Sequence, residues 1–381
     1  MNKPLLVSLF LLIMLLSSPA EAQEVQFPEP DLSVLQETVN SLKNEWQSFL
    51  PNLQLEDLVA EAKRGRGFDW QAAARSLTRY FFREVVAGSK LLGQLLVLVV
   101  FAALLSNLAQ SFPMQGAVRV AQALLFLTMM AVAIQSYHVA LNTGKTAIDN
   151  MVSFMQALLP ILFTMMVASG SVASIAVLHP LLIAIVAILG TLTQDIIFPL
   201  LYLSTALSLV TYVVPEINVG RLASFVAGLC ITLLGLVLCA FVGFSSVQGA
   251  TAKVVDGVSI RSAKFLAASF VPVIGKLFAD ALEAVVGYSA ILQTAVSTVG
   301  MVLLLFICAF PLLKILALIM VYKLAAALAD PIADSRVARC LGGLGNSLAF
   351  IFATVGVVAL LFFLALTALI GVGSLLWGRG G

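Results

Sequence analysis

Charged side chains are scarce over most of this chain. From Leu91 to the C-terminus, 291 residues contain only 20 Asp, Glu, Lys and Arg residues, which gather in short clusters between long apolar runs. The whole chain is 61% hydrophobic and has a mean hydropathy of +1.07. A water-soluble domain of this size needs a larger polar shell. The scarcity of charge therefore excludes a soluble globular protein and indicates an integral membrane protein.

Cysteine and histidine are also rare. No cysteine precedes Cys230, so no disulfide framework is expected in the N-terminal region. Two histidines are too few for a metal cluster, and we expect His179 and Cys340 to lie in loops. No nucleotide-binding loop, zinc-protease motif or serine-hydrolase motif occurs, and the net charge of +2 gives no support for nucleic-acid binding. We predict no enzymatic activity, no cofactor and no metal.

Long apolar runs make up most of the chain after Leu91. A hydrocarbon core about 30 Å thick needs about 20 apolar residues per helix. The runs that reach or approach this length are Leu91–Leu108, Val118–Val139, Leu158–Leu178, Leu181–Val214, Leu222–Val247, Ala284–Leu328 and Ser347–Leu376. Two of them, Leu181–Val214 and Ala284–Leu328, are long enough for two passes. The sequence predicts an all-α, polytopic transmembrane helical bundle with seven to nine spans over residues 91–381, and the glycines of 342–345 are expected to form the turn before the last helix.

The first residues have the pattern of a secretory signal peptide. Lys3 supplies the positive start, Leu5–Leu16 the apolar centre, and Ala20 and Ala22 fit the small-residue rule for cleavage. The alternative is an uncleaved anchor, although the apolar run is short for a membrane span. Residues 1–22 are thus interpreted as the signal peptide, and in either case residues 23–90 would be carried across the membrane.

The exported segment, residues 23–90, is amphipathic and contains 10 acids and 8 bases. Arg75, Arg79 and Arg83 recur every four residues and form one cationic stripe. This pattern predicts a helix that lies on a membrane surface or a partner, or one whose charged face is simply solvated. Exported bases next to a first span conflict with the positive-inside rule, but that rule weakens for long translocated segments, so the signal sequence decides the orientation.

The prolines suggest an internal duplication. Pro160 and Pro199 are 39 residues apart, as are Pro272 and Pro311. The tetrapeptide that contains Pro199, Phe-Pro-Leu-Leu, recurs around Pro311. We take residues 151–247 and 262–376 as the two repeats, with the four prolines as helix breaks. An even number of passes per repeat would make the repeats parallel and an odd number would make them inverted.

The second repeat is charged where the first is not. Lys276, Asp280 and Glu283 share one helical face, and the opposite face is apolar. We favour an interfacial helix here, while a re-entrant segment or a helix that lines a wet cavity remain alternatives.

Two further charges lie among apolar residues. Lys314 has apolar neighbours on both sides within a predicted span, and Asp195 divides another apolar run. A charge at mid-bilayer is costly, so it usually faces protein or water. Lys314 is therefore a candidate for lining a pore or for an ion pair, with Asp195 as its conceivable partner, although Asp195 is more simply read as part of a loop between two spans.

The most distinctive stretches are a polar loop and the blocks that follow it. The loop runs from Ser246-Val247-Gln248-Gly249-Ala250 to Lys264-Phe265; then come Phe310-Pro311-Leu312-Leu313-Lys314, Tyr322-Lys323-Leu324-Ala325, Asp334-Ser335-Arg336 and Gly345-Asn346-Ser347-Leu348. Together they resemble the stage III sporulation protein AE family, from about Leu91 to the last helix. The exported segment carries no matching motif.

This resemblance implies an integral protein of the mother-cell membrane that surrounds the forespore in an endospore-forming bacterium. It implies partners as well: membrane lipid, other membrane proteins of the same sporulation operon and a forespore membrane protein. Together with this chain, the partner proteins form a channel-like complex that supports late forespore gene expression. The resemblance implies no catalytic residues. The alternatives are an independent secondary transporter, suggested by the repeat and Lys314, and a purely structural membrane scaffold.

Overall fold

A computed structural model gives the architecture of the chain. It describes residues 70–111, 115–213, 219–270, 274–332 and 335–373, together with Gln36. Within these residues every regular element is a helix. Because a bilayer offers the backbone no hydrogen-bond partners, helices are what long apolar runs must form there. The helical fold class is confirmed.

The helices are unusually long. They are α4 (Trp70–Ser111), α5 (Gln115–Ala168), α6 (Val172–Thr191), η1 (Leu192–Ile197), α7 (Phe198–Val213), α8 (Gly220–Phe270), α9 (Ile274–Ala329) and α10 (Ser335–Gly373). The π-helix η1 joins α6 to α7, and the three form one rod. At 1.5 Å per residue, the 56 residues of α9 extend about 84 Å. The rods therefore exceed the thickness of one hydrocarbon core.

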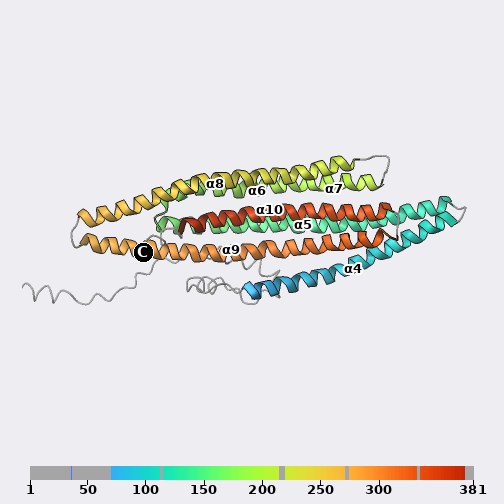
Figure 1. Ribbon diagram of the computed structural model, residues 1–381, viewed down its shortest axis with the longest axis horizontal. Coiled ribbons are helices and arrows are strands. Elements are labelled where there is room, and N and C mark those ends of the chain that lie inside the picture. Colours follow the sequence, from blue (N-terminus) through green and yellow to red (C-terminus); the bar gives the residue numbers. More distant parts are fainter. Residues whose placement is uncertain are drawn as a thin grey trace, which may run out of the picture.

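The rods lie side by side as antiparallel pairs (Figure 1). α4 packs on α5, α7 on α8, and α9 on α10. In each pair the chain turns at the same end of the bundle, on the right of Figure 1. We call this the connection end; it is marked by Ser111, Val213 and Ala329, the last residues of α4, α7 and α9.

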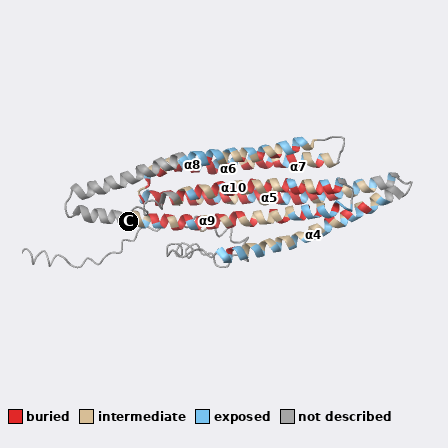
Figure 2. Cartoon of the chain, viewed as in Figure 1, coloured by how far each residue is buried: buried red, intermediate tan, exposed pale blue. Residues whose placement is uncertain are grey.

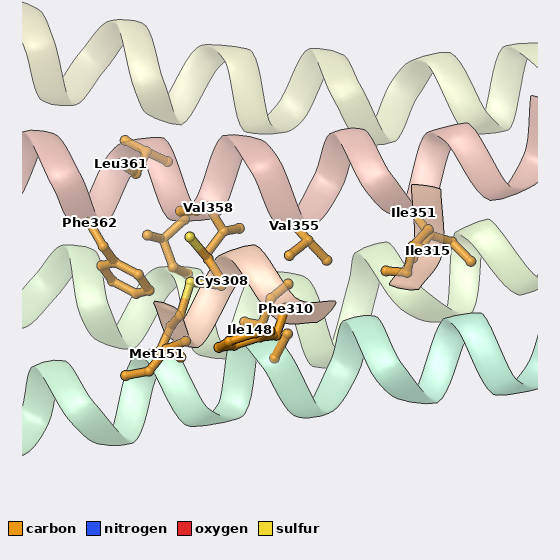
Figure 3. Close-up of a cluster of buried hydrophobic side chains, with 14 of the residues drawn as sticks. Ile148, Met151, Cys308, Phe310, Ile315, Ile351, Val355, Val358, Leu361 and Phe362 are labelled. Carbon is orange, nitrogen blue, oxygen red and sulfur yellow. The ribbon is translucent and has the colours of Figure 1, made fainter. Parts of the chain in front are cut away.

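The core lies where α5, α9 and α10 meet. Side chains that face the neighbouring rods are buried, and those on the outer faces are exposed (Figure 2). Figure 3 shows part of this core, where Ile148 and Met151 of α5 lie beside Phe310 of α9 and Val355 and Val358 of α10. Each of these side chains is fully buried or nearly so. α10 is the central helix, since it packs against α5, α6, α7, α8 and α9.

Six helical segments of the described chain are long and apolar enough to cross a membrane. The count of seven to nine spans is therefore not supported. Both runs with room for two passes are undivided, because Val172–Tyr212 and Ala284–Ala329 are continuous helical segments. The helix breaks assigned to Pro160 and Pro311 are also wrong, since α5 and α9 continue through them.

Three predicted loops are helical instead. His179 lies inside α6, where its ring packs 4.7 Å from that of Phe163. Asp195 lies in η1, and Cys340 is buried inside α10. The glycines of 342–345 do not form a turn but belong to α10 as well. A short polar or glycine-rich interruption predicts a loop only when packing does not stabilise the helix across it.

The duplicated tetrapeptide occupies equivalent positions in two pairs of rods. Phe198–Leu201 lies in the rod that pairs with α8, and Phe310–Leu313 lies in the rod that pairs with α10. Both rods run towards the connection end (Figure 1). The boundaries of the two repeats stay predictions, but the direction of these rods suits the parallel version.

Candidate functional site

A polar section interrupts the apolar character of the bundle about midway along its rods. In α5 it includes Asn142, Lys145 and Asp149, which follow one apolar run and precede another. Lys145 is exposed and Asp149 is half-buried. An ionisable residue flanked by apolar turns on both sides marks a functional position by default.

The π-helix η1 brings a second polar group to the same section. The Phe198 N–H donates to the carbonyl of Thr193, five residues earlier, which widens the turn. Pro199 accounts for this geometry, because in a regular α-helix it could not donate a hydrogen bond and its ring would clash with the carbonyl four residues before it. The Gln194 amide then donates a hydrogen bond to the Asp149 carboxylate of α5. Single π turns are frequent at functional sites.

The same section passes through α9, α10 and α4. Phe310 of α9 lies beside Ile148, the neighbour of Asp149 (Figure 3). Phe310 also meets the ring of Tyr80 in α4 edge to face, with 4.8 Å between centroids. Val355 of α10 approaches Gly144 of α5. Contacts between all four helices thus define one cross-section, which we call the polar cross-section.

The predicted charges Lys314 and Asp195 both belong to this polar cross-section. Lys314 lies one turn beyond Phe310 and is half-buried. Asp195 is exposed on η1, and no ion pair joins it to Lys314 in the described part of the chain. Arg79, the neighbour of Tyr80, adds an exposed cation from α4. The structure therefore brings both residues to one level without pairing them.

The structure says less about the other residues that the sequence predicts as site residues. Lys276, Asp280 and Glu283 belong to the helical backbone of α9, but their side chains lie outside the described residues. Pro272 and the signal-peptide residues Ala20 and Ala22 also lie outside the described residues. Pro160 and Pro199 are exposed, and Pro311 is half-buried.

The predicted cationic stripe is part of α4. Arg75, Arg79 and Arg83 are exposed on one face of this helix. α4 continues without interruption from Trp70 through Lys90 into the first apolar run. Residues 70–90 of the amphipathic segment are therefore the first half of the rod whose second half is the first predicted span.

Sequence reasoning missed two polar contacts between rods, one half-buried and one fully buried. One is the bond between Gln194 and Asp149. The other is made by Gln293 of α9, whose amide nitrogen donates to the Leu369 carbonyl of α10 at 3.1 Å and whose oxygen accepts from Ser169 at 3.5 Å. Gln293 is fully buried. Gln293 is the one carboxamide side chain in the apolar run Ala284–Leu328, and a buried amide needs hydrogen-bond partners. That isolation is a sequence signal by which the contact could have been predicted.

Taken together, the long apolar rods and their polar cross-section define a polytopic α-helical membrane protein. The stage III sporulation protein AE family matches residues 53–373. The stage III sporulation protein AE of Bacillus subtilis (strain 168) is 37% identical over 336 residues, which cover 88% of this chain and 84% of the relative. The chain belongs to the stage III sporulation protein AE family, and the resemblance found in its sequence is confirmed. No solved structure matches it.

Proposed function

We propose that this protein is a membrane subunit of the channel-like complex that joins mother cell and forespore, and that late forespore gene expression depends on it. The observation that carries the proposal is the family match, which spans the whole bundle including the polar cross-section. The match to the Bacillus relative supports a role in sporulation, and the six long apolar helices support a place in a membrane, which we propose to be that of the mother cell.

The length of the rods supports a subunit of a larger assembly. The apolar segment Val172–Tyr212 has 41 residues and extends about 60 Å, roughly twice the hydrocarbon thickness of a bilayer. Exposed apolar side chains occur on both sides of the polar cross-section, for example Val172 before it and Val210 after it, about 57 Å apart on the same rod. One bilayer cannot cover both regions of an upright bundle, whereas partner proteins of a complex can cover the region that the lipid leaves bare.

Deletion of the gene in a spore-forming host tests this proposal. We expect sporulation to stop after engulfment, with a late forespore transcription reporter silent, and a wild-type copy to restore both. Normal spores with an active reporter would reject the proposal and would leave the independent transporter as the leading alternative.

A second experiment separates a conduit from a scaffold. Lys314→Leu removes the half-buried charge of the polar cross-section, and Lys314→Arg keeps it. If the cross-section lines a solute path, Lys314→Leu should abolish sporulation while the protein still reaches the membrane, and Lys314→Arg should complement. Full complementation by Lys314→Leu would instead favour a scaffold.

A further inference from the structure

A pocket of about 300 Å³ lies near the connection end, between α4, α5 and the first turn of α10. α4 contributes Ala102 and Ser106, and α10 contributes Arg336. The side of α5 that faces them contributes Gln122, Phe126 and Met129. This volume is at the lower end of the range for small-molecule sites. It suits a small headgroup and the first carbons of one chain.

The walls of the pocket are graded in polarity along the bundle. Ser106, Gln122 and Arg336 are the polar members, and each lies nearer the connection end than the apolar members of its helix. Ala102 lies one turn deeper than Ser106 on α4, about 6 Å along the axis. On α5, Phe126 and Met129 lie about 6 Å and 10 Å deeper than Gln122. A ligand that fits this gradient is polar at one end and apolar at the other.

The position of the pocket relative to a bilayer agrees with this polarity. From Asp195 in the polar cross-section to Val213 at the connection end, the chain rises about 27 Å, close to one hydrocarbon thickness. At the pocket itself, α4 contributes Ala102 and Ser106 from its apolar half. When the hydrocarbon core of a bilayer extends from the polar cross-section to the connection end, the headgroups on the connection-end side lie at the polar rim of the pocket. Exposed bases gather at this end of the bundle: Arg221, Lys323, Arg336 and Arg339.

We propose that this pocket binds one anionic phospholipid. Its phosphate accepts hydrogen bonds from the Arg336 guanidinium, with Ser106 and Gln122 beside it, and one acyl chain begins along Ala102, Phe126 and Met129. The guanidinium has five N–H donors, so it serves a phosphate in addition to its contact within the protein. Charge complementarity selects an anionic headgroup over a zwitterionic one, since Arg–phosphate contacts are charge-assisted and often bidentate.

Native mass spectrometry of the full chain released from nanodiscs tests the proposal. The nanodiscs contain equal amounts of phosphatidylglycerol and phosphatidylcholine, and the spectra count the lipids that stay bound. We expect the wild type to retain phosphatidylglycerol preferentially and Arg336→Gln to lower that preference about fivefold, the effect of one basic residue near an anionic surface. Arg221→Gln is the matched control, because it removes an exposed charge from the same end outside the pocket.

Two further arms make the outcome decisive. Ala102→Phe fills the apolar part and keeps the charge, so it should also lose the bound phosphatidylglycerol; it carries the test if Arg336→Gln does not fold. Glycerol 3-phosphate in excess should not displace the lipid, because it lacks the chain. Equal retention of the two lipids by the wild type, an Arg221→Gln effect as large as that of Arg336→Gln, or displacement by glycerol 3-phosphate would each overturn the proposal.

Discussion

The ring of Tyr80 meets the ring of Phe310 edge to face, with 4.8 Å between centroids and 76° between ring planes. Tyr80 belongs to the amphipathic half of α4, and Phe310 belongs to the centre of α9. The contact holds a cationic helix against the polar cross-section of an otherwise apolar bundle. The segment that the sequence predicts on a membrane surface or a partner is thus docked on the protein itself.

Tyr80→Ala should loosen the first half of α4 from the bundle. An edge-to-face pair contributes about 1 kcal/mol beyond the area it buries. We expect a lower midpoint of thermal unfolding in detergent and faster proteolysis within residues 70–90. Phe82→Ala is the control, because Phe82 is 62% exposed and its ring contact is with Phe81 of the same helix. Equal effects of the two variants would contradict the docking role of Tyr80.

Changes at Gln194 should report on the bond between η1 and α5. Gln194→Leu leaves the Asp149 carboxylate without this donor, and we expect a loss of about 1 kcal/mol in stability. Gln194→Glu places a second carboxylate against Asp149 and should cost more, because like charges repel. Thermal unfolding of the two variants at neutral pH checks the order. A Gln194→Glu protein as stable as the wild type would show that the contact carries no stability.

Gly144 marks a close approach of α5 to α10. A Cβ at this position would lie 2.8 Å from the Ile351 side chain and 3.2 Å from that of Val355. Gly144→Leu should therefore destabilise the protein by about 1–3 kcal/mol through overpacking. The control is Gly228→Leu in α8, where a Cβ has no neighbour within 4 Å and leucine favours the helix. Thermal unfolding should separate the two variants, and equal midpoints would contradict this packing.

Cysteine labelling in a cysteine-free background should establish the sidedness of the connections. If the N-terminal segment is exported, as its sequence predicts, six spans place the connection end on the cytoplasmic side of the membrane. We expect Glu216→Cys and Ile332→Cys to react from that side, and Gln36→Cys to react from the opposite side. Labelling of Glu216→Cys and Ile332→Cys from opposite sides would exclude parallel repeats. Labelling of Gln36→Cys from the cytoplasmic side would exclude an exported N-terminal segment.

Composition alone was enough to predict an all-helical membrane protein, because apolar runs as long as Ala284–Leu328 have few other stable structures in lipid. The polar loop of residues 246–265 and the blocks that follow it, including the one around Pro311, were enough for the family. The number of spans was not predictable in this way. Pro160 and Pro311 predict breaks locally, yet α5 and α9 continue through them. Neighbouring helices pack before and after each proline: α5 at Gly144 against Val355 and at Phe163 against His179, and α9 at Gly300 against Leu158 and at Val321 against Gly88.

Lys314 and Asp195 could be singled out from the sequence, because charge is conspicuous in an apolar run. The alignment of distant helices decides the rest. It places Lys314 and Asp195 in the same cross-section, brings Gln194 to Asp149, and forms the pocket at Arg336. Residue spacing specifies one face of one helix, but the register between two rods is set by the packing of many side chains at once. The sequence by itself therefore determined the membrane class, the all-helical fold class and the charged positions. Only the tertiary structure decided where the helices begin and end and which of those positions meet.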